Sequence, residues 1–168
     1  MSFDKPYEGI KVVDLSQGVA GPYCAMLLAR HGAEVVKVEP LEGDWSSALG
    51  AVYGDNTAFS VAANLGKKSL ALDLRAPEGK AIFRRLAATA DAVLNNLRGD
   101  QPAKLGLTYD ALSGLRPAIV CAHITGYGRK GARAAWPAYD FLMQAEAGFM
   151  AVTGEPGTGP NRRRSHPR

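Results

Sequence analysis

The chain has 168 residues, of which 46% are hydrophobic and 21% charged, and it carries a formal net charge of +4. These values are typical of one soluble globular domain. No apolar run approaches the roughly 20 residues that a membrane-spanning helix requires, and residues 1–9 lack the basic-then-apolar order of a secretory signal. We therefore expect a cytoplasmic protein with no membrane partner.

The excess of basic over acidic residues is confined to the end of the chain. Of 20 lysines and arginines, four lie in residues 161–168 (NRRRSHPR), and removing them leaves 16 basic side chains against 16 acidic ones. A nucleic-acid-binding protein spreads basic residues over a folded face, so we expect no nucleic-acid partner. Cys24 and Cys121 are expected to be separate thiols, and no His, Cys or carboxylate cluster has metal-ligand spacing.

The first structural unit covers residues 11–39. Residues 11–15 (KVVDL) are typical of a buried strand, residues 16–21 (SQGVAG) form a glycine-containing turn, and Pro22 is suited to open a helix that ends at Gly32. A second strand follows at residues 35–39. A right-handed crossover then places the two strands side by side in a parallel sheet.

The turn at residues 16–21 is a candidate ligand site. Free N–H groups at a helix N-terminus attract anions, and ligands of open α/β sheets bind beyond the carboxyl ends of the strands. Glu39 imitates the acid that holds a ribose in dinucleotide-binding folds, but the glycines are spaced G-x-x-G rather than G-x-G-x-x-G. The residues alone leave open a nucleotide-like ligand, an NAD-type enzyme, or a tight turn without a ligand.

Strand and helix patterns alternate through the rest of the chain. Helices are predicted at residues 56–64, from Pro77 with Ile82 and Phe83 on its apolar face, after Thr108, and from Pro137 to Gly148. Strands are predicted at residues 67–74, 92–94 and 119–122. This alternation indicates an α/β fold with a Rossmann-like open parallel sheet and helices on both faces.

Several phrases, in order and at matching spacing, resemble the family III CoA-transferases, which include formyl-CoA and carnitine CoA-transferases and the α-methylacyl-CoA racemases. The matching phrases are GIKVVDLS (9–16), AGP (20–22), GAEVVKVEP (32–40), GD (43–44), Asn64, KKS (67–69), LDL (72–74), PEG (77–79), LGL (105–107), GYG (126–128), YD (139–140), QA (144–145) and TGEP (153–156). The resemblance covers nearly all of residues 9–160.

The resemblance implies a CoA thioester as substrate and a carboxylic acid as its partner. By position, the backbone of Gly18, Val19 and Ala20 would approach CoA, Leu72 and Arg75 would border the adenine, and Lys104 would meet the phosphates. This chemistry agrees with the residue types, because phosphates favour Lys or Arg. We expect residues 1–160 to form a partial N-terminal CoA-binding domain and residues 161–168 to be a basic tail that is foreign or disordered.

The resemblance also implies covalent catalysis through an Asp that forms an acyl anhydride and lies a few residues beyond the position of Pro160. Residues 161–168 contain no carboxylate, so we expect a chain truncated before its nucleophile, with no catalytic residue and a fold incomplete relative to the family. Asp140 corresponds to the start of the preceding helix. Tyr139 stands where the racemases have a histidine, which favours the transferases; a racemase and a non-catalytic CoA-binding fragment remain the alternatives. Full-length members form interlocked homodimers, and we expect dimerisation to be weakened here.

Overall fold

A computed structural model describes residues 4–153, 157, 159 and 160 of the chain. They fall into two compact units, one ending at Ile124 and the other beginning at Thr125. Each unit is described by itself. The predicted tail at residues 161–168 lies outside the described residues, so the proposed boundary at residue 160 stays a prediction.

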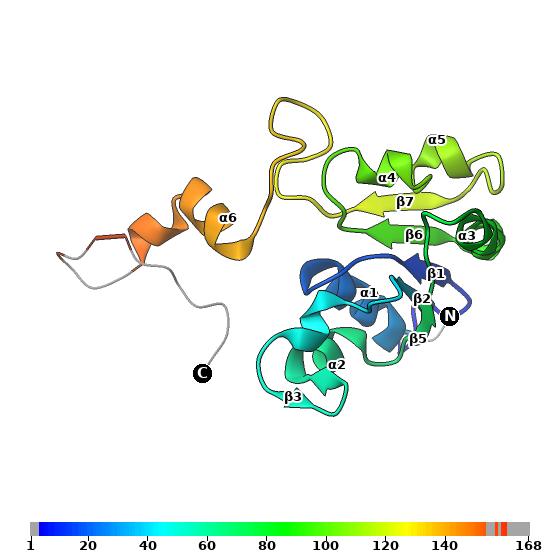
Figure 1. Cartoon of the computed structure of the whole chain (residues 1–168), viewed down its shortest axis with the longest axis horizontal. Helices are drawn as coiled ribbons and strands as arrows, with labels where there is room; N and C mark the ends of the chain where they lie inside the picture. The colour runs from blue at the N-terminus through cyan, green and yellow to red at the C-terminus, as the bar shows by residue number, and fades with distance from the viewer. Residues whose placement is uncertain (1–3, 154–156, 158, 161–168) are drawn as a thin grey trace. The chain divides into compact units, whose positions relative to one another are not determined.

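In the first unit, strands and helices alternate along the chain (Figure 1). The elements are β1 (Lys11–Asp14), α1 (Ala20–Arg30), β2 (Glu34–Glu39), a 3-10 turn (Trp45–Ala48), β3 (Val52–Tyr53), β4 (Asn56–Thr57), α2 (Ala58–Asn64), β5 (Lys68–Ala71), α3 (Pro77–Thr89), β6 (Ala92–Asn95), α4 (Gln101–Lys104), α5 (Tyr109–Leu112) and β7 (Val120–His123).

Five of these strands form one parallel sheet in the order β5-β2-β1-β6-β7. Strand β1 is central: Val13 pairs with Val36 of β2 on one side and with Val93 of β6 on the other. Along the chain, strands are added on one side of β1 as far as β5 and on its other side from β6 onward, so the strand order switches between β1 and β6. This arrangement confirms the predicted α/β class with a Rossmann-like open parallel sheet.

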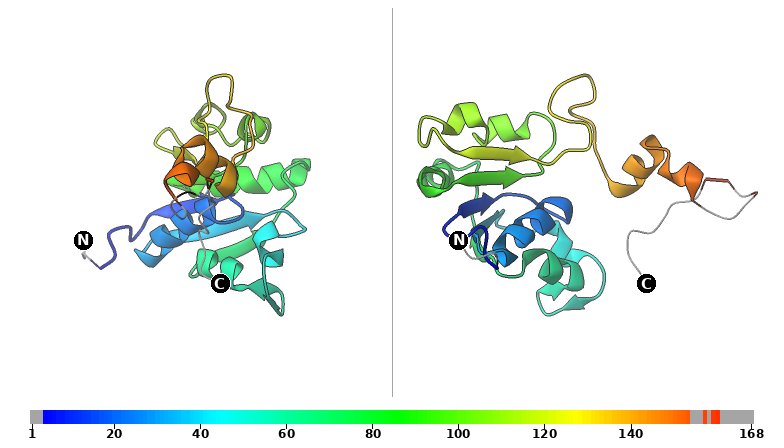
Figure 2. Two further views of the ribbon diagram at one scale, coloured as in Figure 1. Left: turned by 90° about the vertical axis from the view of Figure 1, so that its left-hand side faces the viewer. Right: turned by 180° about the vertical axis from the view of Figure 1, so that it is seen from behind.

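Each face of the sheet packs against its own helices, as the two further views also show (Figure 2). Successive strand residues point to opposite faces, so Val12 packs with Ala25 of α1 while Val13 packs with Phe83 and Ala87 of α3. Burial of each such large side chain contributes about 1.5–3 kcal/mol. The prediction of helices on both faces is confirmed, although Ile82 is 41% exposed rather than buried.

Several predicted boundaries move by a few residues. Helix α1 begins at Ala20, so Pro22 is its third residue; that position tolerates proline because the first four helical N–H groups have no partner within the helix. Residues 56–57, predicted to be helical, form β4 and pair with β3. Thr57 then caps α2, because its hydroxyl accepts the Ser60 N–H. Strand β5 is shorter than the predicted 67–74.

The second unit contains α6 (Asp140–Glu146) and a 3-10 turn (Phe149–Val152) among its described residues. Helix α6 begins three residues later than Pro137, the predicted start. The preceding loop places Arg133 over the Trp136 ring, 4.9 Å from its centroid, and pairs it with Glu146 at 2.6 Å. None of the helices in the described part of the chain has the length and hydrophobicity to cross a bilayer.

Candidate functional site

A pocket of about 340 Å³ lies where the carboxyl ends of β1, β2, β5 and β6 meet, within the first unit. This is the edge of the sheet at which open α/β proteins bind ligands. Its lining is largely aliphatic with a charged rim and two amides. The residues are Leu15, Gln17, Val38, Glu39, Pro40, Leu41, Glu42, Leu72, Asp73, Leu74, Arg75, Leu97, Gln101 and Leu105.

Two of the sequence-predicted binding residues line this pocket. Leu72 is buried at the end of β5, and Arg75 is exposed three residues later. The Arg75 side chain is held by Asp73, whose carboxylate accepts both the Arg75 backbone N–H at 2.9 Å and its Nε at 3.1 Å. These hydrogen bonds lower the pKa of Asp73, and the Arg75 side chain stays exposed to solvent. An aliphatic wall beside a planar cation suits an aromatic base.

The other four predicted residues, all in the described part of the chain, are not pocket-lining. Lys104 ends α4, between the lining residues Gln101 and Leu105, and pairs with Asp100 at 2.7 Å on the surface. Gly18, Val19 and Ala20 follow the lining residue Gln17. Their roles in binding stay predictions.

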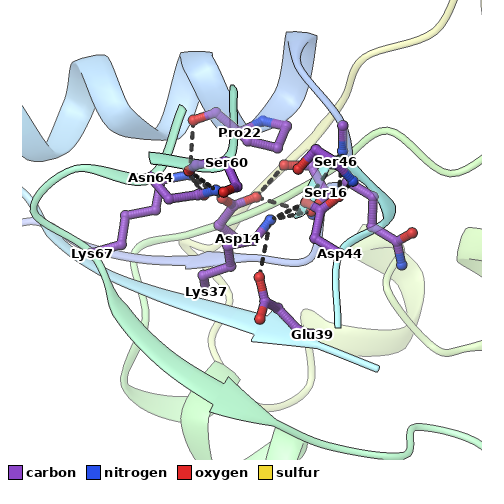
Figure 3. A network of polar contacts seen from close by, with 12 residues as sticks. Asp14, Ser16, Pro22, Lys37, Glu39, Asp44, Ser46, Ser60, Asn64 and Lys67 are labelled. Carbon is purple, nitrogen blue, oxygen red and sulfur yellow. Dashed lines mark hydrogen bonds and ion pairs between the residues drawn. The ribbon is translucent and has the colours of Figure 1, made fainter. Parts of the chain in front are cut away.

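The turn before α1 is fixed by a buried ion pair (Figure 3). Lys37 of β2 and Asp44 lie 2.8 Å apart, with side chains 2% and 1% exposed. The Lys37 Nζ also donates to the Ser16 carbonyl at 2.7 Å, and the Asp44 Oδ1 accepts the Gly18 N–H at 2.9 Å. The same Oδ1 accepts the Ser46 N–H at 2.9 Å. One ion pair therefore holds both sides of the Gln17 residue.

Gly18 is required at this turn. Its φ of +78° is in the left-handed region, and a Cβ there would lie 2.2 Å from the Trp45 ring. Because its N–H is bound to Asp44, Gly18 has no backbone donor left for a ligand. The N–H groups of Val19 and Ala20 bind no acceptor within the described residues, and they remain available at the start of α1.

A second buried ion pair lies beside the first. Lys67 donates to the Asp14 Oδ2 at 2.7 Å, to the Pro22 carbonyl at 2.8 Å and to the Asn64 Oδ1 at 2.9 Å. The side chains of Lys67 and Asp14 are 2% and 0% exposed. Asp14 also accepts the Ser16 N–H at 3.0 Å and the Ser16 hydroxyl. This pair ties β1, the first turn of α1 and α2 together.

Burial and hydrogen bonding act in opposite directions on these groups. Burial raises the pKa of Asp44, but hydrogen bonds from Lys37, Ser46 and Gly18 outweigh it and lower the pKa below its ordinary value of 3.8. Burial lowers the pKa of Lys67, and the Asp14 carboxylate offsets part of that change. The Asp44 carboxylate is therefore ionised at neutral pH.

Sequence reasoning assigned no role to these buried charges or to Gln17. A usable signal was present, since Asp14 lies in the apolar run KVVDL and Lys37 in EVVKVE. A strand covered on both faces buries every side chain, and a buried charge requires a partner. Which partner it finds depends on residues 7 to 53 positions away, so spacing along the chain could not supply it.

No group of three or more His, Cys, Asp or Glu side chains within the described residues is arranged to hold a metal ion. Neither Cys24 nor Cys121 forms a disulfide within the described residues. The site consists of an aliphatic pocket, a charged rim and a clamped glycine turn. It defines a Rossmann-like protein with a ligand pocket at the point where the strand order reverses.

The chain belongs to CoA-transferase family III, whose sequence profile matches residues 7–166. It is 42% identical over 163 residues to a succinate–glutarate CoA-transferase of Agrobacterium fabrum, covering 92% of this chain and 41% of that protein. It is 36% identical over 160 residues to the succinyl-CoA:glutarate CoA-transferase of Homo sapiens, covering 94% of this chain and 36% of the human protein.

Solved structures agree with the sequence comparison. A CAIB/BAIF family protein from Brucella suis superposes with a TM-score of 0.89 at 37% identity, over 95% of this chain and 44% of that one. A hypothetical protein (Rv3272) from Mycobacterium tuberculosis gives a TM-score of 0.82 at 35% identity, over 94% of this chain and 44% of that one. This chain spans about two fifths of the length of the curated relatives it matches.

Proposed function

We propose that this chain binds the nucleotide end of a CoA thioester in the pocket at the carboxyl ends of β1, β2, β5 and β6. The observation that carries the proposal is the coincidence of the family match with an aliphatic pocket bordered by Leu72 and Arg75. Adenine would lie against the aliphatic wall beside the Arg75 guanidinium. Lys104 and the free N–H groups of Val19 and Ala20 would meet phosphates, because each supplies a donor to an anion.

For the whole protein we propose transfer of CoA between an acyl-CoA and a carboxylic acid. By the resemblance, an Asp carboxylate attacks the donor thioester carbonyl and expels the CoA thiolate, leaving an acyl anhydride. The CoA thiolate then attacks the Asp carbonyl of the anhydride, which releases the donor carboxylate and leaves an Asp–CoA thioester. The acceptor carboxylate attacks this thioester and expels the CoA thiolate, which attacks the acceptor carbonyl of the new anhydride to give the new acyl-CoA and the free Asp carboxylate. The relatives named for succinate and glutarate support a dicarboxylic acid as one substrate, and a homodimer in the cytoplasm is proposed on the same basis.

We propose that the 168-residue chain itself binds CoA without catalysing transfer. Residues 161–168 contain no Asp or Glu, and the nucleophile implied by the resemblance falls beyond Pro160. Binding and turnover are therefore expected to separate in this chain.

Isothermal titration with CoA and with NAD tests the binding proposal. We expect a single CoA site and no heat of binding from NAD, because the G-x-x-G turn lacks the dinucleotide spacing. Binding of NAD without binding of CoA would overturn the proposal. Succinyl-CoA with glutarate tests catalysis, and turnover by this chain would refute the absence of a nucleophile.

A further inference from the structure

The two peptide groups that flank the Gln17 Cα are fully hydrogen-bonded. Besides the Lys37 and Asp44 contacts to its neighbours, the Gln17 N–H donates to the Asn96 Oδ1 at 2.9 Å. Its carbonyl accepts the Asn96 Nδ2 at 2.7 Å. Asn96 directly follows β6, and Lys37 lies in β2. Side chains from both sides of β1 therefore fix this peptide.

The Gln17 side-chain amide, in contrast to the Gln17 backbone, is not used in these contacts. The side chain is half-buried, it lines the pocket, and its amide has no hydrogen-bond partner among the described residues. A primary amide both donates and accepts, so it matches an edge that carries a donor beside an acceptor. The adenine ring carries such an edge, and the neighbouring walls of Leu15, Leu72 and Leu97 would contact its faces.

We propose that the Gln17 side-chain amide hydrogen-bonds the base of the ligand, and that the Lys37–Asp44 pair and Asn96 are positioning residues that present it. This inference rests on the proposed function, because it assigns one contact within that site. The turn would then contact two parts of the ligand. The Gln17 side chain would hydrogen-bond the base, and the N–H groups of Val19 and Ala20 would bind the phosphates.

The fixed backbone explains why Gln17 rather than Gly18 would make this contact. A ligand that displaced Asp44 from the Gly18 N–H would deprive the buried Lys37–Asp44 pair of a hydrogen bond. The free-energy cost of that loss exceeds the gain from one new hydrogen bond to the ligand. The Gln17 amide can bind without breaking any protein contact. A preorganised backbone also reduces the entropy lost when the side chain is immobilised.

The test measures three ligands by isothermal titration: CoA, adenosine 3′,5′-bisphosphate and pantetheine. Gln17→Met removes the amide and keeps the length and an unbranched side chain. We expect CoA and the bisphosphate to bind about five- to tenfold more weakly, the loss typical of one neutral hydrogen bond, with pantetheine unchanged. Gln144→Met, an amide deletion in α6, is the matched control and should change none of the three affinities.

The positioning part is tested by coupling. Asn96→Ala releases the Gln17 peptide without uncovering a buried charge, and in that background Gln17→Met should weaken CoA binding less than twofold. Thermal unfolding of each variant checks that it folds; if Asn96→Ala does not, Asn96→Asp, which can still accept the Gln17 N–H, replaces it.

Each outcome decides between the proposals. Equal CoA affinity for wild type and Gln17→Met overturns the role of Gln17 and leaves the proposed function standing. An undiminished Gln17→Met effect in the Asn96 variant overturns the positioning role. Absence of CoA binding to the wild-type chain rejects the proposed function itself.

Discussion

The two sets of ion pairs in the first unit differ in almost every physical respect. Beneath the glycine turn, Lys37–Asp44 and Lys67–Asp14 are at most 2% exposed. On the surface, Arg75 at the pocket is 78% exposed, and Lys104, which lies beside the lining residue Leu105, is 64% exposed. Buried pairs are costly to break, whereas exposed pairs contribute about 0–1 kcal/mol. The comparison indicates that the buried pairs hold the shape of the turn, whereas the exposed cations can exchange their partners at little cost.

The largest expected effect comes from leaving one buried charge unpaired. Lys67→Met strands the fully buried Asp14 carboxylate and removes three hydrogen bonds, so we expect the free energy of unfolding to fall by about 3–5 kcal/mol. Urea denaturation measures the loss. The double variant Asp14→Asn/Lys67→Met removes the unpaired charge and should recover part of it; a double variant no more stable than Lys67→Met would contradict the buried-charge explanation.

A smaller effect is expected at the turn itself. Gly18→Ala places a Cβ at a φ of +78° and against the Trp45 ring, which we expect to cost about 1–3 kcal/mol. Gly43→Ala is the matched control, because Gly43 has a φ of +83° with nothing within 4 Å of its Cβ position. The difference between the two urea midpoints isolates the Trp45 contact. Equal midpoints would show that the ring moves aside freely.

The pH dependence distinguishes the buried acid from the rim acids. The folded pKa of Asp44 lies below its ordinary value of 3.8, so its contribution is present above that value and is lost as the pH falls through the lower folded pKa. We expect the urea midpoint to drop between about pH 5 and pH 2, and to drop less in Asp44→Asn. The pKa values of Asp73 and Asp100 are also lowered, chiefly by hydrogen bonds from the Arg75 backbone N–H and from the Lys104 side chain. Because those groups are exposed, 0.5 M NaCl should suppress their part and leave that of Asp44.

The smallest change in stability is expected at the rim. Arg75→Ala removes an exposed pair, so the urea midpoint should stay the same, while CoA binding should weaken about tenfold through loss of a charged contact. Lys68→Ala removes a comparable exposed pair with Glu34, at the opposite end of the strands. It should leave CoA affinity unchanged. A similar loss of CoA affinity in both variants would show a general charge effect rather than a site.

The sequence determined the sheet and the outline of the site. Apolar strand runs alternating with helices required a parallel sheet covered on both faces, because that arrangement buries both faces of each strand. The family resemblance, carried over by position, named Leu72 and Arg75, and both line the pocket. The alternation of strands and helices repeats along the chain, so it can be read from the sequence pattern, whereas the two pocket residues depended on the resemblance.

Only the tertiary structure decided which polar groups are in contact. Asp14 and Lys67 are 53 residues apart, and Gln17 and Asn96 are 79 apart, yet both pairs are in hydrogen-bond contact. The strand order brings β2 and β6 to either side of β1, and that order follows from the packing of the whole sheet rather than from any local pattern. For the same reason, the sequence marked Gly18 as a turn but could not show that its N–H binds Asp44.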